Sequence, residues 1–76
     1  MEDDDIEAVI RGYLSKKTPD GYYVIPAKPE ARKLVEKYRG ISLEETGILI
    51  IVKTRSRSIA EKILRKLYSA GLLGEY

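Results

Sequence analysis

Hydrophobic side chains in the first part of the chain recur at the spacing of one helix face, at Ile6, Val9, Ile10, Tyr13 and Leu14. Residues three and four positions apart lie on the same side of an α-helix. Three aspartates, Asp3 to Asp5, precede this stripe, and carboxylates at a helix start provide an N-cap and complement the helix dipole. The pattern therefore predicts an acidic helix within residues 1–17.

A turn and a short strand are expected next. Thr18 to Gly21 reads Thr-Pro-Asp-Gly, in which the proline fixes φ and the glycine accepts a positive φ. Tyr22 to Ile25 is an aromatic and β-branched run that closes at Pro26. We expect a turn at 18–21 and a strand at 22–25.

The pattern then returns to helical spacing. Pro29 suits the first turn of a helix, and Gly40 suits its end. The apolar positions between them again repeat at three and four residues: Ala31, Leu34, Val35 and Tyr38. A second helix is predicted over this segment.

The segment from Ile41 to Thr54 has two interpretations. Ser42 to Glu45 has the composition of a capping box, which opens a helix, whereas Ile48 to Val52 is an apolar, largely β-branched run after Gly47, typical of a buried strand. We favour the strand, serving either internal burial or pairing of two copies. If Leu43 to Val52 were helical, this segment and the last helix would form a helix-turn-helix of the winged-helix kind.

The last element is a helix with signals at both ends. Ser58 to Glu61 reads as a capping box, and Gly71 stands where a left-handed C-cap is expected. The buried stripe comprises Ile59, Ala60, Ile63, Leu64 and Leu67. Residues 72–76 form a tail too short for a further element.

These elements alternate as helix, strand, helix, strand and helix. We therefore predict one small two-layer α+β domain spanning residues 1–76, with the acidic helix at 1–17 and a βαβα core at 22–71. A chain of 76 residues buries only about 60% of the surface that its unfolded chain exposes, less than a larger domain does, so a homodimer would add to its core.

Composition removes several classes of function. The chain has no cysteine and no histidine, which excludes disulfides, thiolate metal sites and classical catalytic triads. We expect no enzyme activity, no catalytic residues, no metal and no cofactor. The acidic amino terminus and the absence of a long apolar run predict a cytoplasmic protein that does not enter membranes. The 34% of charged residues resembles the surface chemistry of thermophile proteins.

Positive charge is concentrated in the second half of the chain. The net charge is only +2, yet residues 31–76 carry ten bases against five acids. Residues 53–58, at the predicted strand-to-helix junction, combine a lysine, two arginines and three hydroxyl groups. Phosphate oxygens are bound by these groups and by the free N–H groups of a helix start. The alternatives are an anion site and a solvated, capped helix end.

Two stretches resemble the Alba family of archaeal chromatin and RNA-binding proteins. Ile51 to Ile59 is similar to that family's second strand and the turn opening its next helix, and Tyr23 to Pro29 is similar to its first strand and helix start. The resemblance covers about residues 22–70 and lacks the family's C-terminal β-hairpin. It implies a βαβα core in which Lys28, Arg55 and Arg57 lie together and face nucleic acid.

The function expected from these patterns is nucleic-acid binding through the phosphate backbone, with DNA or RNA as the partner. The expected binding residues are Lys28, Lys53, Arg55, Arg57, Ser58, Lys62, Arg65 and Lys66. Tyr22 and Tyr23 are either base-stacking platforms or half-buried residues of the sheet. The alternative function is a protein-protein interaction or assembly module without a nucleic-acid role, which the modest net charge favours.

Overall fold

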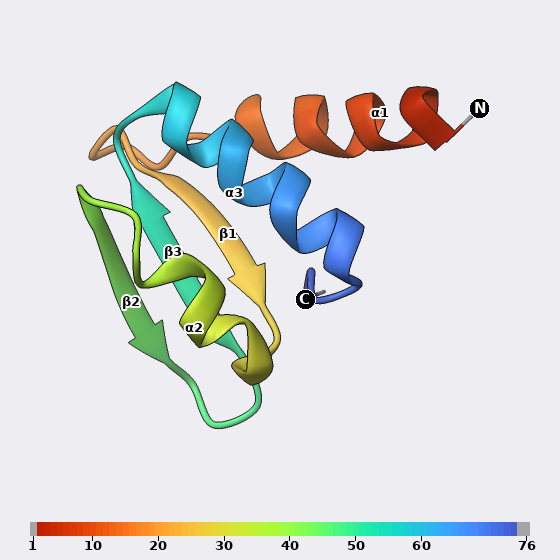
Figure 1. The fold of residues 1–76 in the computed structure, drawn as a ribbon. Coiled ribbons are helices and arrows are strands. Elements are labelled where there is room, and N and C mark those ends of the chain that lie inside the picture. Colours follow the sequence, from red (N-terminus) through yellow and green to blue (C-terminus); the bar gives the residue numbers. More distant parts are fainter. Residues whose placement is uncertain (1, 75–76) are drawn as a thin grey trace.

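The computed structural model describes residues 2–74, with side chains from Ile6 onward. The predicted capping by Asp3 to Asp5 and the last two residues of the tail lie outside this description. The elements follow in the order α1 (Glu2–Leu14), β1 (Tyr23–Ala27), the 3-10 turn η1 (Pro29–Ala31), α2 (Arg32–Val35), β2 (Ile41–Glu45), β3 (Ile50–Thr54) and α3 (Arg57–Ala70) (Figure 1). Within the described residues, no helix is long and apolar enough to cross a membrane.

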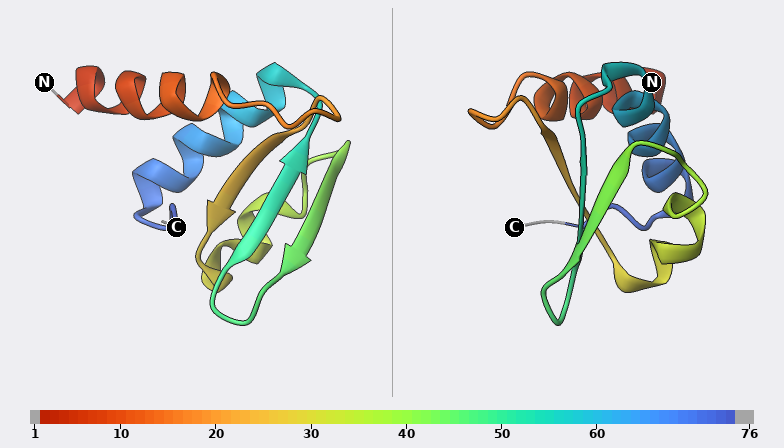
Figure 2. Two further views of the ribbon diagram at one scale, coloured as in Figure 1. Left: turned by 180° about the vertical axis from the view of Figure 1, so that it is seen from behind. Right: turned by 90° about the vertical axis from the view of Figure 1, so that its left-hand side faces the viewer.

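The three strands form one antiparallel sheet in the order β1-β3-β2. The helices cover one face of this sheet and leave the other face open (Figure 2). The prediction of a small two-layer α+β domain is therefore confirmed. Because β3 is the central strand and pairs on both sides, two copies cannot pair through this strand. Ile50, Ile51 and Val52 are buried within the domain, whereas Ile48, predicted to belong to the strand, lies before it and is 80% exposed.

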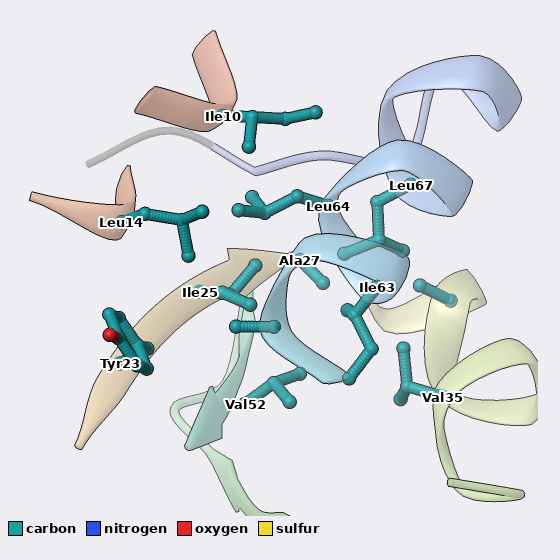
Figure 3. Close-up of a cluster of buried hydrophobic side chains, with 12 residues drawn as sticks. Ile10, Leu14, Tyr23, Ile25, Ala27, Val35, Val52, Ile63, Leu64 and Leu67 are labelled. Atoms are coloured by element: carbon teal, nitrogen blue, oxygen red, sulfur yellow. The ribbon is translucent and has the colours of Figure 1, made fainter. Parts of the chain in front are cut away.

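The core lies between the sheet and the helices. Side chains alternate along a strand, so the register Ile25↔Val52 places these two residues on the same face, beneath α3. Figure 3 shows them meeting Ile63 and Leu67, and all four are fully buried. Burial of one such aliphatic side chain stabilises the fold by about 1.5–3 kcal/mol. The predicted stripe of the last helix is part of this core, as are Ile10, Leu14, Ala31 and Val35 of the other two predicted stripes. Val9 and Leu34 are outside the core cluster, and the second helix ends at Val35, earlier than predicted.

The segment before β3 is a strand, which the sequence analysis did not predict. Ile41 and Leu43 pack against the core while the residues between and after them are exposed, the period of two of a sheet. Pairing of β2 along the whole of β3 overrides the local capping-box pattern of Ser42 to Glu45. The helix-turn-helix alternative is therefore wrong.

Strand β1 also runs further than predicted, through Pro26 to Ala27. Proline has no N–H to give to a ladder, so a strand tolerates it where its N–H would point away from the neighbouring strand. The carbonyl of Pro26 points away from β3 and accepts a hydrogen bond from the Gly74 N–H at 2.9 Å. Pro26 therefore costs the sheet no hydrogen bond.

The carboxyl-terminal segment covers the outer edge of β1. Gly71 has a φ of 70° and ends α3 as predicted. The chain then turns so that Leu73 bridges Ala27, and the Lys28 N–H donates to the Leu72 carbonyl at 2.9 Å. Gly74 fits closely here, because a Cβ at this position would lie 3.1 Å from the Ala27 nitrogen. The tail thus closes one edge of the sheet.

We expect Gly74→Ala to lower the free energy of unfolding by about 1–2 kcal/mol, because the added methyl group is forced against the backbone of β1. Gly12→Ala is the control, since Gly12 lies within α1 and has nothing within 4 Å of its Cβ position. That substitution should raise the free energy of unfolding by about 0.5–1 kcal/mol. Chemical denaturation followed by circular dichroism measures both, and equal effects would contradict the close approach.

Candidate nucleic-acid interface

One end of the sheet gathers basic residues from three separate segments. In the register, Tyr23 of β1, Thr54 of β3 and Ile41 of β2 lie side by side. Neighbouring strands are about 4.8 Å apart, so the three strand ends lie within about 10 Å of each other. The connections at this end carry six exposed bases, and we call the four nearest to the strand ends the basic end: Lys17, Arg39, Arg55 and Arg57.

The charges of the basic end are not neutralised by the described part of the chain. None of its four bases has a carboxylate within ion-pair distance among the described residues. The same connections contain two acids, Asp20 and Glu36, the second of which lies beside α2. These connections are residues 15–22, 36–40 and 55–56 together with the first turn of α3. That first turn contains no acidic residue and carries Arg57, a charge that the helix dipole disfavours. Positive potential is therefore concentrated here, where a bound anion would relieve it.

A buried threonine holds two of the three connections together. Thr54 is the one buried polar side chain among the described residues. Its hydroxyl donates to the Gly40 carbonyl at 3.1 Å and accepts from the Ser56 N–H at 3.1 Å. The connection that carries Arg39 is thereby fixed against the one that carries Arg55.

Helix α3 begins earlier than the sequence predicts. Its N-cap is Ser56, which has extended backbone angles and accepts a hydrogen bond from the Ile59 N–H at 3.3 Å. The predicted capping box from Ser58 to Glu61 is therefore wrong. The Thr54 hydroxyl positions Ser56 for this role, while Ser58 lies exposed in the first turn, its hydroxyl 3.2 Å from that of Ser56.

Arg55 lies on the open face of the sheet. The Tyr23↔Thr54 register, extended by one residue, places Tyr22 opposite Arg55, and the guanidinium carbon lies 4.7 Å from the centre of the Tyr22 ring. Cation–π contacts of this kind orient the guanidinium without neutralising it. Tyr23 points the other way and is 5% exposed, so it is a core residue, while Tyr22 remains half-buried.

The preceding turn fixes Tyr22, and it forms as the sequence predicts. The Gly21 N–H donates to the Thr18 carbonyl at 2.8 Å, and Gly21 has a φ of 88°. The Thr18 hydroxyl accepts from the Tyr22 N–H at 3.0 Å, and the Thr18 N–H donates to the Tyr22 carbonyl. On the helix-covered face of the sheet, the Lys17 ammonium lies 5.2 Å from the centre of the Tyr23 ring.

Two of the predicted binding residues are engaged in ion pairs. Arg65 bridges Glu7 of α1 at 2.6 Å and Glu61 of its own helix at 3.2 Å. The hydrogen bonds that its guanidinium donates, first to Glu7 and second to Glu61, raise the pKa of Arg65. Lys53 is half-buried and pairs with Glu44 at 3.4 Å. The ion pair of Arg65 with Glu7 joins α3 to α1. Exposed pairs of this kind contribute modestly to stability.

Lys28 lies at the far end of the sheet, so its predicted position beside Arg55 and Arg57 is wrong. Parallel strands would bring both strand-to-helix junctions to one edge, but β1 runs antiparallel to β3. Lys28 follows Ala27, which pairs with the first residue of β3, and Arg55 follows the last. The positions of Lys28 and Arg55 along the sheet are six residues apart, which corresponds to roughly 20 Å along the strand.

The structure brings Arg55, Arg57 and Ser58 together and adds two bases that the sequence analysis missed, Lys17 and Arg39. No local pattern marks either of these two as a binding residue, because only the strand register brings them to the same end. Lys62 and Lys66 are exposed one turn apart on α3, which starts at the basic end. They extend the positive surface along that helix.

We expect Ser56→Ala to lower the free energy of unfolding by about 1 kcal/mol, because the first turn of α3 loses its cap. Ser58→Ala, two residues away, should change it by less than about 0.5 kcal/mol. Thermal or urea unfolding of the two variants measures the difference. A greater loss for the Ser58 variant would mean that the helix starts where the sequence alone placed it.

A scan against protein-family models and searches of curated proteins and of solved structures find no match for this chain. The resemblance of Ile51 to Ile59 to the Alba family stays a prediction.

Proposed function

We propose that this protein binds nucleic acid through the phosphate backbone at its basic end. The observation that carries the proposal is the convergence of four exposed, unpaired bases from three segments at one end of the sheet. Among the other described bases, Arg32, Lys53 and Arg65 are held in ion pairs. The charge at the basic end has no comparable structural use.

The chemistry of these residues suits phosphate. The guanidinium groups of Arg55 and Arg57 present paired N–H donors to two phosphate oxygens, while Lys17 acts as a point charge. The Ser58 hydroxyl and the amino terminus of α3 add donors beside Arg57. Lys62 and Lys66 give the backbone a second stretch of contact along α3. This is recognition of the backbone, not of the sequence.

The first expected result is a steep dependence of affinity on salt. Neutralisation of four to six phosphates gives a slope of log K against log[salt] of about −4 to −5 on duplex DNA and about −3 to −4 on a single strand. Fluorescence anisotropy with labelled oligonucleotides at several salt concentrations measures it. A slope near zero, or no binding at low salt, would overturn the proposal.

Charge reversal tests the location. The double variant Arg55→Glu, Arg57→Glu should bind about 10- to 100-fold more weakly at 0.1 M salt, with a slope shallower by about 2. The matched control is Lys28→Glu, Lys33→Glu, which changes the net charge equally at exposed residues away from the basic end. Both variants keep the core residues, and circular dichroism checks their folding. Equal losses would show that net charge alone, and not the basic end, governs binding.

A further inference from the structure

A hollow of about 320 Å³ lies next to the basic end, on the open face of the sheet. Small-molecule sites begin at about 300 Å³, so it has room for one planar ring system. The turn before β1 forms one wall and the sheet forms its floor. The side chains that matter here are Thr18, Asp20, Tyr22, Ser42, Glu44 and Lys53.

The hollow combines an aromatic ring with polar groups at its rim. Tyr22 lines the hollow, whereas Arg55, whose guanidinium contacts the Tyr22 ring, does not. Lys53 is paired with Glu44 at 3.4 Å. Asp20, by contrast, has no ion-pair partner among the described residues. Its carboxylate is therefore available to accept hydrogen bonds.

The charge of the hollow differs from that of its surroundings. Asp20 and Glu44 outweigh Lys53, so a phosphate group is repelled from the hollow although it is attracted to the adjacent basic end. A neutral, flat group with N–H donors fits the hollow instead. A nucleotide has both parts, because its base is flat and neutral and its phosphate is anionic.

We propose that the hollow binds one unstacked base of a single-stranded nucleic acid, an inference that rests on the proposed function of the basic end. The base stacks on Tyr22, and its sugar-phosphate backbone runs toward Arg55 and its neighbours. A base within a duplex cannot enter, because it is stacked and paired. The protein is therefore assigned a single strand as its ligand.

Guanine has the edge that fits best. Its ring N–H and exocyclic amine lie side by side and match the two oxygens of a carboxylate such as Asp20, while its carbonyl oxygen suits a donor such as Lys53 or Ser42. Adenine offers one exocyclic amine and no neighbouring N–H. The turn around Thr18 and Gly21 holds Asp20 and Tyr22 in place before the base arrives, which lowers the ordering cost of binding.

The test uses fluorescein-labelled uridine-rich octanucleotides that contain one guanosine, inosine or adenosine, together with the DNA equivalents and the guanosine strand in a duplex. Inosine lacks only the exocyclic amine, so we expect it to bind about fivefold more weakly than guanosine. The duplex should bind more weakly than the single strand at equal salt. Comparison of the RNA and DNA strands shows which sugar the protein prefers.

Tyr22→Ala should weaken binding of the guanosine strand about 5- to 20-fold, and Tyr22→Phe, which keeps the ring, should restore most of it. Tyr68→Ala is the control, since Tyr68 is exposed on α3 away from the hollow. Asp20→Asn should abolish the preference for guanosine over inosine, whereas Glu30→Gln, with the same change of charge, should keep it.

The outcomes separate this inference from the proposed function. If the three bases and the duplex bind equally and Tyr22→Ala has no effect, while the reversal of Arg55 and Arg57 still removes binding, the base site is wrong and the backbone site stands. If no oligonucleotide binds but guanosine shifts the NMR signals of Tyr22 and Ser42, the hollow takes a free nucleoside, and both the backbone site and the assignment of a single strand are wrong. Absence of both responses overturns both.

Discussion

The antiparallel pairing of β3 with strands on both sides is the constraint on which the rest of this structure depends. It buries Ile50, Ile51 and Val52 and provides the surface on which α1, α2 and α3 pack. It also decides which loops meet. Because β1 and β2 both run opposite to β3, the start of each lies beside the end of β3, and their preceding segments join the segment that opens α3.

The ion pairs and hydrogen bonds divide the charged residues into two groups. Arg32 and Arg65 connect elements that are distant in the sequence, Arg32 through Glu45 of β2 and Arg65 through Glu7 of α1. The bases of the basic end make no such connection within the described chain. Thr54 instead fixes the backbone around two of them through Gly40 and Ser56, so the side chains stay exposed on a rigid support. A rigid support lowers the entropy lost when a ligand binds.

The open face of the sheet places two kinds of surface side by side. At the basic end, Arg55, in contact with Tyr22, presents positive charge. Next to it lies a hollow in which carboxylates outnumber bases. A site that binds phosphate alone would need only the positive charge of Arg55. The two together are suited to a ligand whose anionic backbone and neutral rings alternate, which is the chemistry of a single nucleic-acid strand.

Local signals in the sequence were sufficient for several elements. The turn that ends at Gly21, the left-handed C-cap at Gly71 and the apolar stripe of α3 depend on interactions between residues close in the chain, and the structure has all three. Local signals failed where pairing with another strand decided the outcome. Ser42 to Glu45 carries a helix-start pattern and is a strand, because β3 supplies a ladder for it.

The same distinction applies to the candidate site. The sequence by itself determined that Arg55, Arg57 and Ser58 would lie together where a strand gives way to a helix, since they are neighbours in the chain. Only the tertiary structure decided that Lys17 and Arg39 join them and that Lys28 does not. Strand direction and register are set by pairing between segments, 23–31 residues apart for β1 with β3 and 5–13 for β2 with β3, and the pattern within one segment does not specify them.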